Sequence, residues 1–91
     1  MKKEEYRVLI IPSGQRDIDN IKDKNLLERL KESMLKLITT PRPIGCTKLL
    51  GKEGGYRIRV GEYRYCYRID EQNKTIYIYR VKHRKEVYRN L

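Results

Sequence analysis

Arginine alternates with apolar or aromatic residues along the last third of this chain. Seven of the eight tyrosines also lie there, between residues 56 and 88. In a β-strand, alternation with a period of two places guanidinium groups on one face of the sheet and apolar groups on the other. The guanidinium-bearing face of the strands expected at 56–60 and 63–69 holds Arg57, Arg59, Arg64 and Arg68. Because like charges on paired strands repel unless an anion bridges them, this patch indicates a polyanionic ligand.

Such a patch could stabilise a phosphate of RNA while it is attacked. Strand scission by the adjacent 2′-hydroxyl needs a base, cations for the pentacoordinate phosphate and a proton donor for the leaving 5′-oxygen. Arginine suits the second task because a guanidinium grips two phosphate oxygens at once. The chain has one histidine, which excludes an acid–base mechanism that uses two histidines. Asp and Glu residues do not cluster near the patch, so the sequence does not favour a nuclease that uses two metal ions. A tyrosine or lysine base remains, with its pKa lowered by the surrounding positive charge.

The residues after the strand expected at 75–81 extend this set. His83 and Arg84 follow that strand after Lys82, and Tyr88 lies four positions beyond Arg84. If residues 83–91 form a helix, Arg84 and Tyr88 share one face. The alternative for these residues is an extended tail. A solvent-exposed, non-catalytic role for His83 and a core-edge role for Tyr88 also remain open.

The elements that must position these side chains follow from local patterns. Residues 6–11 predict a strand stopped by Pro12, and Ser13 is the predicted cap of a short helix over 14–21. Asn25, with Glu28 three positions later, predicts the start of a second helix, which ends before Pro41. The predicted apolar stripe of that helix is Leu27, Leu30, Met34, Leu37 and Ile38.

A connecting segment at 44–55 then leads to three strands, at 56–60, 63–69 and 75–81. Gly61 and Glu62 form a two-residue hairpin turn between the first two. The third strand is ambiguous, because the pattern does not say whether Arg80 or Tyr79 faces the helices. The order β-α-α-β-β-β predicts a small α+β fold, an antiparallel sheet with a helical hairpin on one face.

The length and net charge of the chain give further expectations. Ninety-one residues predict a single domain over 1–91, and 22 basic against 12 acidic residues give a net charge of +10. This charge favours phosphate-bearing partners. Cys46 and Cys66 do not have the spacing of a zinc site and are expected to be reduced thiols. No apolar run is long enough to span a membrane, so a cytoplasmic location is expected.

Three stretches together resemble the RelE/ParE superfamily of type II toxins, in particular the RelE-like mRNA interferases. They are Lys48-Leu49-x-Gly51, the run from Gly55 to Arg64, and Val81-x-His83-Arg84-x-Glu86-Val87-Tyr88. The element order fits as well, so the resemblance covers essentially the whole chain. It implies an enzyme that cuts mRNA in the ribosomal A site by 2′-hydroxyl attack, without metal or other cofactor.

The resemblance also implies roles for individual residues. Arg57 and Arg59 would hold and activate the RNA, and Arg64 would stabilise the phosphate. Arg84 would stabilise the transition state or protonate the leaving group, and Tyr88 would orient the RNA or act as base. Further candidates for RNA contact are Lys48, Arg68, Lys82 and His83.

The sequence departs from the family pattern at three positions. Lys82 stands where glycine is common, and Arg57 and Arg59 replace lysines of some active members. Since arginine is a poorer proton acceptor than lysine, base duty would shift toward Tyr88.

The resemblance implies partners and leaves alternatives open. It implies a RelB-like antitoxin that wraps and neutralises the chain, and through which the complex would bind its own operator DNA. One alternative is a ParE-like toxin that inhibits DNA gyrase, with the same fold and a protein target. Another is a non-catalytic homologue that binds RNA or DNA without cutting it.

Overall fold

The first element in the described part of the chain is a short strand that leads directly into a helix. The computed structural model describes residues 4–51 and 54–85. Strand β1 spans Arg7–Ile10 and helix α1 spans Pro12–Asp19. Proline suits the first helical position because no hydrogen bond is required of its nitrogen. The predicted cap is wrong: no side chain caps α1, and the Ser13 hydroxyl instead donates to the Tyr79 carbonyl at 2.8 Å.

Helix α2, Lys24–Lys36, begins one residue earlier than Asn25, so the cap predicted there is also wrong. The Asp23 carboxylate accepts a hydrogen bond from the Leu26 backbone N–H at 3.1 Å, and aspartate is a favoured N-cap residue. The buried stripe that begins in α2 consists of Leu26, Leu30, Met34 and Leu37. Leu26 was missed, while Leu27 and Ile38 are only half-buried.

In the part of the chain that the structure describes, five strands form one sheet in the order β1-β5-β4-β3-β2. The remaining strands are β2 Thr47–Lys48, β3 Tyr56–Val60, β4 Tyr63–Asp70 and β5 Thr75–His83. The α+β class and the predicted element order are confirmed. The sheet is mixed, because β1 runs parallel to β5 while the other pairs are antiparallel. Strand β2, inside the predicted connecting segment, is too short to produce an alternating pattern in the sequence.

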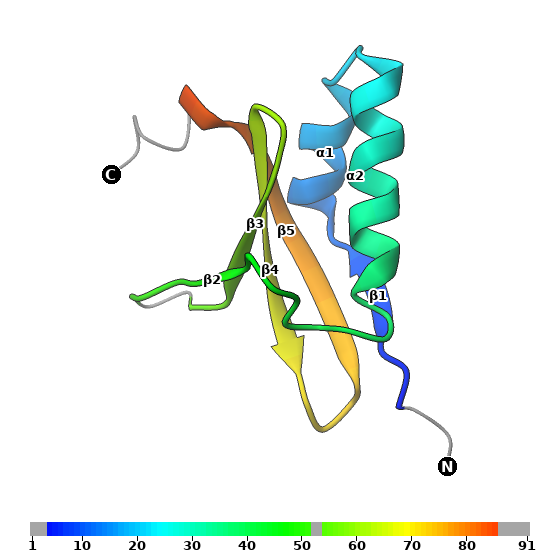
Figure 1. Ribbon diagram of the computed structural model, residues 1–91, viewed down its shortest axis with the longest axis vertical. Coiled ribbons are helices and arrows are strands. Elements are labelled where there is room, and N and C mark those ends of the chain that lie inside the picture. Colours follow the sequence, from blue (N-terminus) through cyan, green and yellow to red (C-terminus); the bar gives the residue numbers. More distant parts are fainter. Residues whose placement is uncertain (1–3, 52–53, 86–91) are drawn as a thin grey trace.

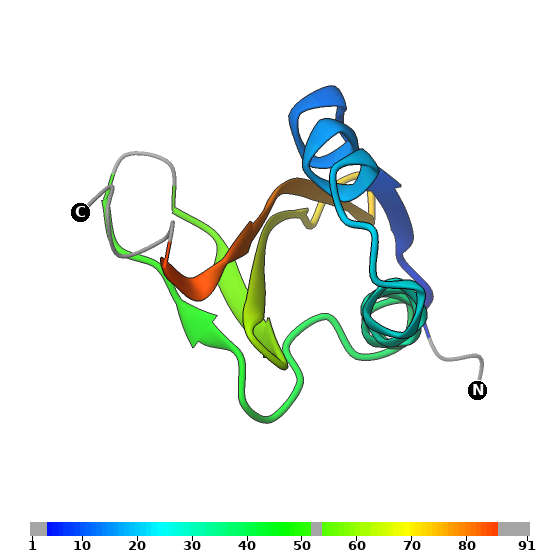
Figure 2. The ribbon, with the colours of Figure 1, turned by 90° about the horizontal axis from the view of Figure 1, so that it is seen from above.

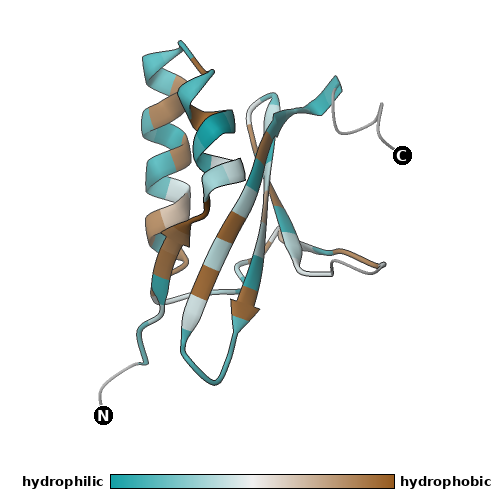
Figure 3. Cartoon of the chain, turned by 180° about the vertical axis from the view of Figure 1, so that it is seen from behind, coloured by the Kyte–Doolittle hydropathy of each residue, from teal (hydrophilic) through white to brown (hydrophobic). Residues whose placement is uncertain are grey.

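Both helices cover the same face of the sheet (Figures 1 and 2). Hydrophobic and polar residues alternate along the long strands (Figure 3), and the apolar side packs against the helices. Helix α1 approaches β5 closely at Gly14, where a Cβ would lie 2.8 Å from the Ile78 carbonyl oxygen. In the described ranges, no helix is both long and apolar enough to cross a membrane.

A β-bulge in β5 resolves the ambiguity of the third strand. Arg80 pairs with Cys66, whereas Ile78 pairs with Tyr67, so Tyr79 is an extra residue on β5. An extra residue reverses which alternate side chains face the core. Ile78 is therefore buried, while Arg80 joins the side of the sheet that faces away from the helices.

Candidate nucleic-acid interface

Three rows of side chains cross the sheet on the side that faces away from the helices. Strand pairing aligns Arg59, Arg64 and Lys82 in one row, Arg57, Cys66 and Arg80 in the next, and Arg68, Tyr77 and Leu9 in the third. We call this surface the arginine face. Directly opposed side chains on paired strands have Cβ atoms about 5 Å apart. The structure thus brings the four predicted strand arginines together and adds Arg80.

Several of these side chains are held by local contacts. The Arg59 Nε donates to the Gly61 carbonyl at 3.1 Å, which draws this guanidinium toward the β3–β4 turn. The Arg68 guanidinium lies 4.7 Å from the centre of the Tyr79 ring, a cation–π contact. Tyr79 is fixed in turn by donating its hydroxyl to the Gly54 carbonyl at 3.2 Å. The bulged residue therefore positions an arginine of the neighbouring strand.

Lys82 lies in the first row but is bound to helix α1. Its ammonium group is 2.9 Å from Asp17 Oδ1, and the Asp17 side chain is only 9% exposed. The other carboxylate oxygen of Asp17 accepts the Val81 backbone N–H at 2.9 Å. An RNA phosphate would therefore compete with Asp17 for Lys82.

Two of the further candidates for RNA contact, Lys48 and His83, lie on the helix side of the sheet by register. Lys48 pairs with Tyr56, and His83 pairs with Tyr63, whose ring it meets edge-on at a centroid distance of 5.3 Å. His83 Nδ1 accepts the Lys85 backbone N–H at 3.2 Å. Neither side chain belongs to the arginine rows, and RNA contact by either stays a prediction.

Arg84 lies beside the tip of the β3–β4 hairpin. Its backbone N–H donates to the Glu62 carbonyl at 2.8 Å, and its Nε is 3.3 Å from the Glu62 carboxylate. His83 Nε2 is 3.9 Å from the same carboxylate. This contact tethers the end of β5 to the hairpin whose arginines form the face. Tyr88, the proposed base, lies outside the described residues, and so does its predicted position beside Arg84.

Two other tyrosines can be set aside as bases. Tyr65 and Tyr67 are fully buried on the helix side of β4. Burial raises the pKa of Tyr65 to about 12, and burial likewise raises the pKa of Tyr67. The Tyr67 hydroxyl donates to the Pro41 carbonyl at 2.7 Å. Both phenols therefore stay protonated at neutral pH and serve packing.

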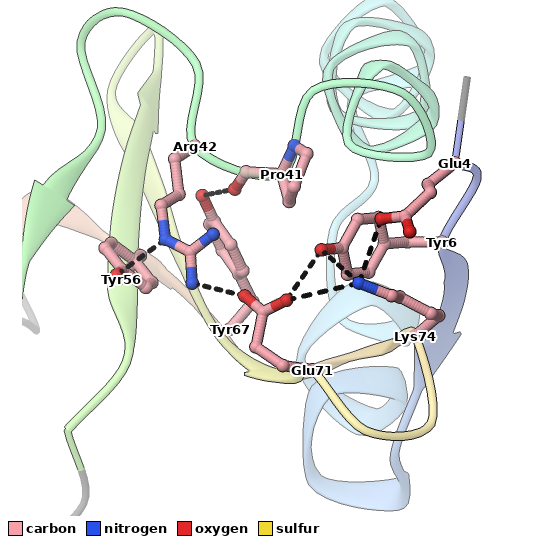
Figure 4. Close-up of polar contacts among 8 residues, drawn as sticks. All are labelled: Glu4, Tyr6, Pro41, Arg42, Tyr56, Tyr67, Glu71 and Lys74. Carbon is pink, nitrogen blue, oxygen red and sulfur yellow. Dashed lines mark hydrogen bonds and ion pairs between the residues drawn. The ribbon is translucent and has the colours of Figure 1, made fainter. Parts of the chain in front are cut away.

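A polar network braces one end of the sheet (Figure 4). Arg42, in the segment after α2, donates from Nε to the Tyr56 hydroxyl at 2.9 Å and pairs with Glu71 at 2.5 Å. The Glu71 carboxylate also accepts a hydrogen bond from the Tyr6 hydroxyl at 2.7 Å, and its Oε2 lies 3.7 Å from the Lys74 ammonium nitrogen. The Arg42 guanidinium and then the Tyr6 hydroxyl lower the pKa of the Glu71 carboxyl. The network fixes the start of β3, the strand that carries Arg57 and Arg59.

Sequence reasoning missed Arg80 because its face depends on the bulge. The sequence pattern predicts only a turn position for Glu62, although its carboxylate also pairs with Arg84. The position of a glutamate at the tip of an arginine-rich hairpin could have indicated this ion pair. Nothing in the local sequence marks Tyr79 as a bulge.

The chain has similarity to known toxins over most of its length. Residues 8–88 match the family described as the ParE toxin of the type II toxin–antitoxin system parDE. A curated relative, Toxin RelG of Mycobacterium tuberculosis, is 33% identical over 86 residues, covering 92% of this chain and 97% of RelG.

Solved structures of toxin–antitoxin complexes share the fold. The toxin–antitoxin complex RelBE2 of Mycobacterium tuberculosis gives a TM-score of 0.75 at 28% identity, covering 87% of this chain and 98% of the matched chain. The archaeal RelE–RelB complex of Pyrococcus horikoshii gives 0.77 at 29% identity, covering 88% and 96%. With this fold and this length of matching sequence, the chain belongs to the RelE/ParE superfamily of toxins of type II toxin–antitoxin systems.

Proposed function

We propose that this toxin is a ribosome-dependent endoribonuclease that cleaves mRNA in the A site and so stops translation in the cytoplasm. In the proposed reaction, the 2′-hydroxyl oxygen attacks the adjacent phosphorus as a base removes its proton. The bond to the 5′-oxygen breaks, and that oxygen takes a proton. The products are a 2′,3′-cyclic phosphate and a 5′-hydroxyl end. No metal ion takes part.

The arginine face is the observation that carries this proposal. Arg57, Arg59 and Arg64 lie on paired strands, so Arg57 and Arg64 can hold the non-bridging oxygens of the cleaved phosphate. Arg59, whose guanidinium turns toward Gly61, can hold the RNA backbone beside it. Arg84, beside the same hairpin, would stabilise the transition state or protonate the leaving oxygen, and Tyr88 would act as base or orient the RNA. Since arginine stays protonated, the face supplies charge stabilisation more readily than proton abstraction. The ribosome would supply the in-line geometry that such a site needs.

The test uses purified toxin, ribosomes paused on a defined codon, and mapping of mRNA ends. Wild type is expected to leave new 5′-hydroxyl ends in the A-site codon. Arg57→Ala and Arg84→Ala should each slow cleavage about 10²–10³-fold, the usual cost of removing one transition-state contact. Tyr88→Phe should also slow it strongly. Arg16→Ala removes an exposed arginine from α1 and is the matched control.

Uncut mRNA with the wild-type chain, where an active interferase cuts, would contradict the proposal. The match to the ParE toxin family favours gyrase inhibition as a second candidate. In that case relaxed plasmid should accumulate in a supercoiling assay while mRNA stays intact. Binding of RNA without either effect would indicate a non-catalytic homologue.

A cognate RelB-like antitoxin is the proposed partner, and an apolar groove is available for it. The groove, about 410 Å³, lies between α1, α2 and β1, and its lining includes Ile10, Leu27, Leu35 and Ile38. Leu35 is 52% exposed and Ile10 is 37% exposed. The structural relatives named above are toxin–antitoxin complexes. We assign the groove to the apolar face of an antitoxin helix, and the complex would contact operator DNA through the antitoxin.

A further inference from the structure

A second basic pocket lies between helix α2 and the β3–β4 hairpin. It has a volume of about 290 Å³. One wall is a polar stripe of α2 at helical spacing, formed by Arg29, Glu32, Ser33 and Lys36. The other wall is the end of β3 and the turn, formed by Arg59, Val60 and Gly61. Sequence periodicity does not reveal this pocket, because its walls come from elements about 30 residues apart.

Two guanidinium groups approach Gly61. It has a φ of +59°, which suits the tight hairpin turn. Its carbonyl accepts Arg59 Nε at 3.1 Å. From the other side Arg29 approaches so closely that a Cβ on Gly61 would lie 3.2 Å from Arg29 Nη1. Cations from α2 and β3 therefore converge across the turn.

The walls of the pocket are anchored and its charge is unbalanced. The Ser33 hydroxyl is hydrogen-bonded to the buried Tyr65 hydroxyl at 2.7 Å, which ties α2 to β4, and Val60 is buried at the base. Three cations face one carboxylate, Glu32. Across the described ranges, no ion pair links Arg29, Lys36 or Arg59 to a carboxylate. An anion in the pocket would offset this repulsion.

We propose that this pocket binds a backbone phosphate of RNA other than the phosphate that is cleaved. The proposal rests on the proposed function only in that the ligand is RNA. Arg59 links the pocket to the arginine face, because it belongs to the first cation row while its guanidinium turns toward Gly61. RNA crossing the face could therefore continue around the hairpin tip. The phosphate could come from the mRNA strand or from ribosomal RNA, which share this chemistry.

The test compares Arg29→Ala/Lys36→Ala with the matched double variant Arg16→Ala/Lys22→Ala. All four side chains are exposed, so both variants should fold like wild type. Binding is measured by fluorescence anisotropy on a single-stranded RNA and by sedimentation with vacant ribosomes, each over a series of salt concentrations. The pocket variant should lose about tenfold in affinity, and its salt slope on single-stranded RNA should fall by about 1.4. The charge-preserving variant Arg29→Lys/Lys36→Arg should bind like wild type.

Loss of affinity for the single-stranded RNA would assign the pocket to mRNA, and loss of affinity for ribosomes alone would assign it to ribosomal RNA. Equal affinities for the pocket and control variants on both probes would overturn the proposal, as would weaker antitoxin binding with RNA binding unchanged. Both probes report binding without cleavage, so the proposal can survive an inactive wild type. If wild type cuts, the ribosome concentration at half-maximal rate should rise about tenfold in the pocket variant. A fall in the saturating rate alone would count against a binding role.

Discussion

At the scale of single residues, neighbouring cations of the arginine face differ in how they are held. Arg80 is exposed on the middle row, opposite Cys66. Lys82, two residues on, is paired with the nearly buried Asp17. A phosphate approaching Lys82 must displace a carboxylate, whereas Arg80 can meet it directly. We therefore expect Arg80 to contribute more to RNA binding than Lys82.

Arg80→Ala should weaken binding of single-stranded RNA and lower the salt slope by about 0.7, since one phosphate contact is lost. Lys82→Ala should change the slope less. Anisotropy titrations at several salt concentrations measure both, with Arg16→Ala as the control. A larger effect of Lys82→Ala would show that Asp17 does not shield Lys82 from RNA.

At the scale of elements, α1 is hydrogen-bonded to the free edge of β5. Beyond Ile78, no strand among the described residues pairs with β5 on that side, since β1 pairs only with residues 75–78. Helix α1 satisfies this edge through Ser13, which donates to the Tyr79 carbonyl, and through Asp17, which accepts the Val81 N–H. Gly14 allows the helix to come close enough for both contacts.

Gly14→Val should destabilise the fold by about 1–3 kcal/mol, because the new side chain meets the β5 backbone and forces α1 outward. The loss of stability is measured by urea unfolding, as a lower midpoint with an unchanged m-value. Arg16→Val places the same side chain at an exposed site of α1, where it meets no β5 backbone. Similar midpoints for the two variants would mean that the close approach at Gly14 is not required.

The network around Glu71 gives the fold a pH dependence. Contacts with Arg42 and Tyr6 lower the pKa of Glu71 below its ordinary value of 4.5, so the unfolded chain takes up this proton first as the pH falls. The stabilisation is therefore complete above pH 4.5 and is lost as the pH falls through the lower folded value.

Glu71→Gln should lower the melting temperature at neutral pH, and the difference from wild type should shrink as the pH falls below 4.5. Thermal unfolding followed by circular dichroism from pH 7 downward measures the difference. Glu5→Gln, at an exposed glutamate, should change little at any pH. A Glu71→Gln difference that is constant with pH would contradict the assignment.

At the scale of the whole molecule, the arginine face and the apolar groove lie on opposite sides of the sheet. The arginine face is turned away from the helices, while the apolar groove lies between the helices and β1. An antitoxin could therefore dock a helix in the groove and cover the arginines with another segment. Its acidic residues would complement a net charge of +10.

Leu35→Glu should weaken the toxin–antitoxin complex, because it puts a charge into the apolar groove. The measurement is co-purification with a cognate antitoxin, together with growth rescue by that antitoxin. Leu50→Glu, at a leucine that is 93% exposed and outside the groove lining, is the control. Full neutralisation of Leu35→Glu would exclude the groove as the docking site.

Local periodicity alone determined much of this molecule. The alternation from Tyr56 to Asp70 was enough to predict two strands, the turn at Gly61 and a shared arginine face, because a strand turns alternate side chains to opposite sides. The leucine spacing of α2 likewise predicted a core helix. Each of these features depends on neighbours within a few residues.

The tertiary structure decided what depends on partners far apart in the sequence. The bulge at Tyr79, which turns Arg80 outward, exists only in the pairing of β5 with β4. The ion pair of Lys82 with Asp17 and the approach of Arg29 to Gly61 depend on how the helices pack on the sheet. Periodicity encodes the face of a residue within its own element. Register and docking arise from packing between elements, which a local pattern does not contain.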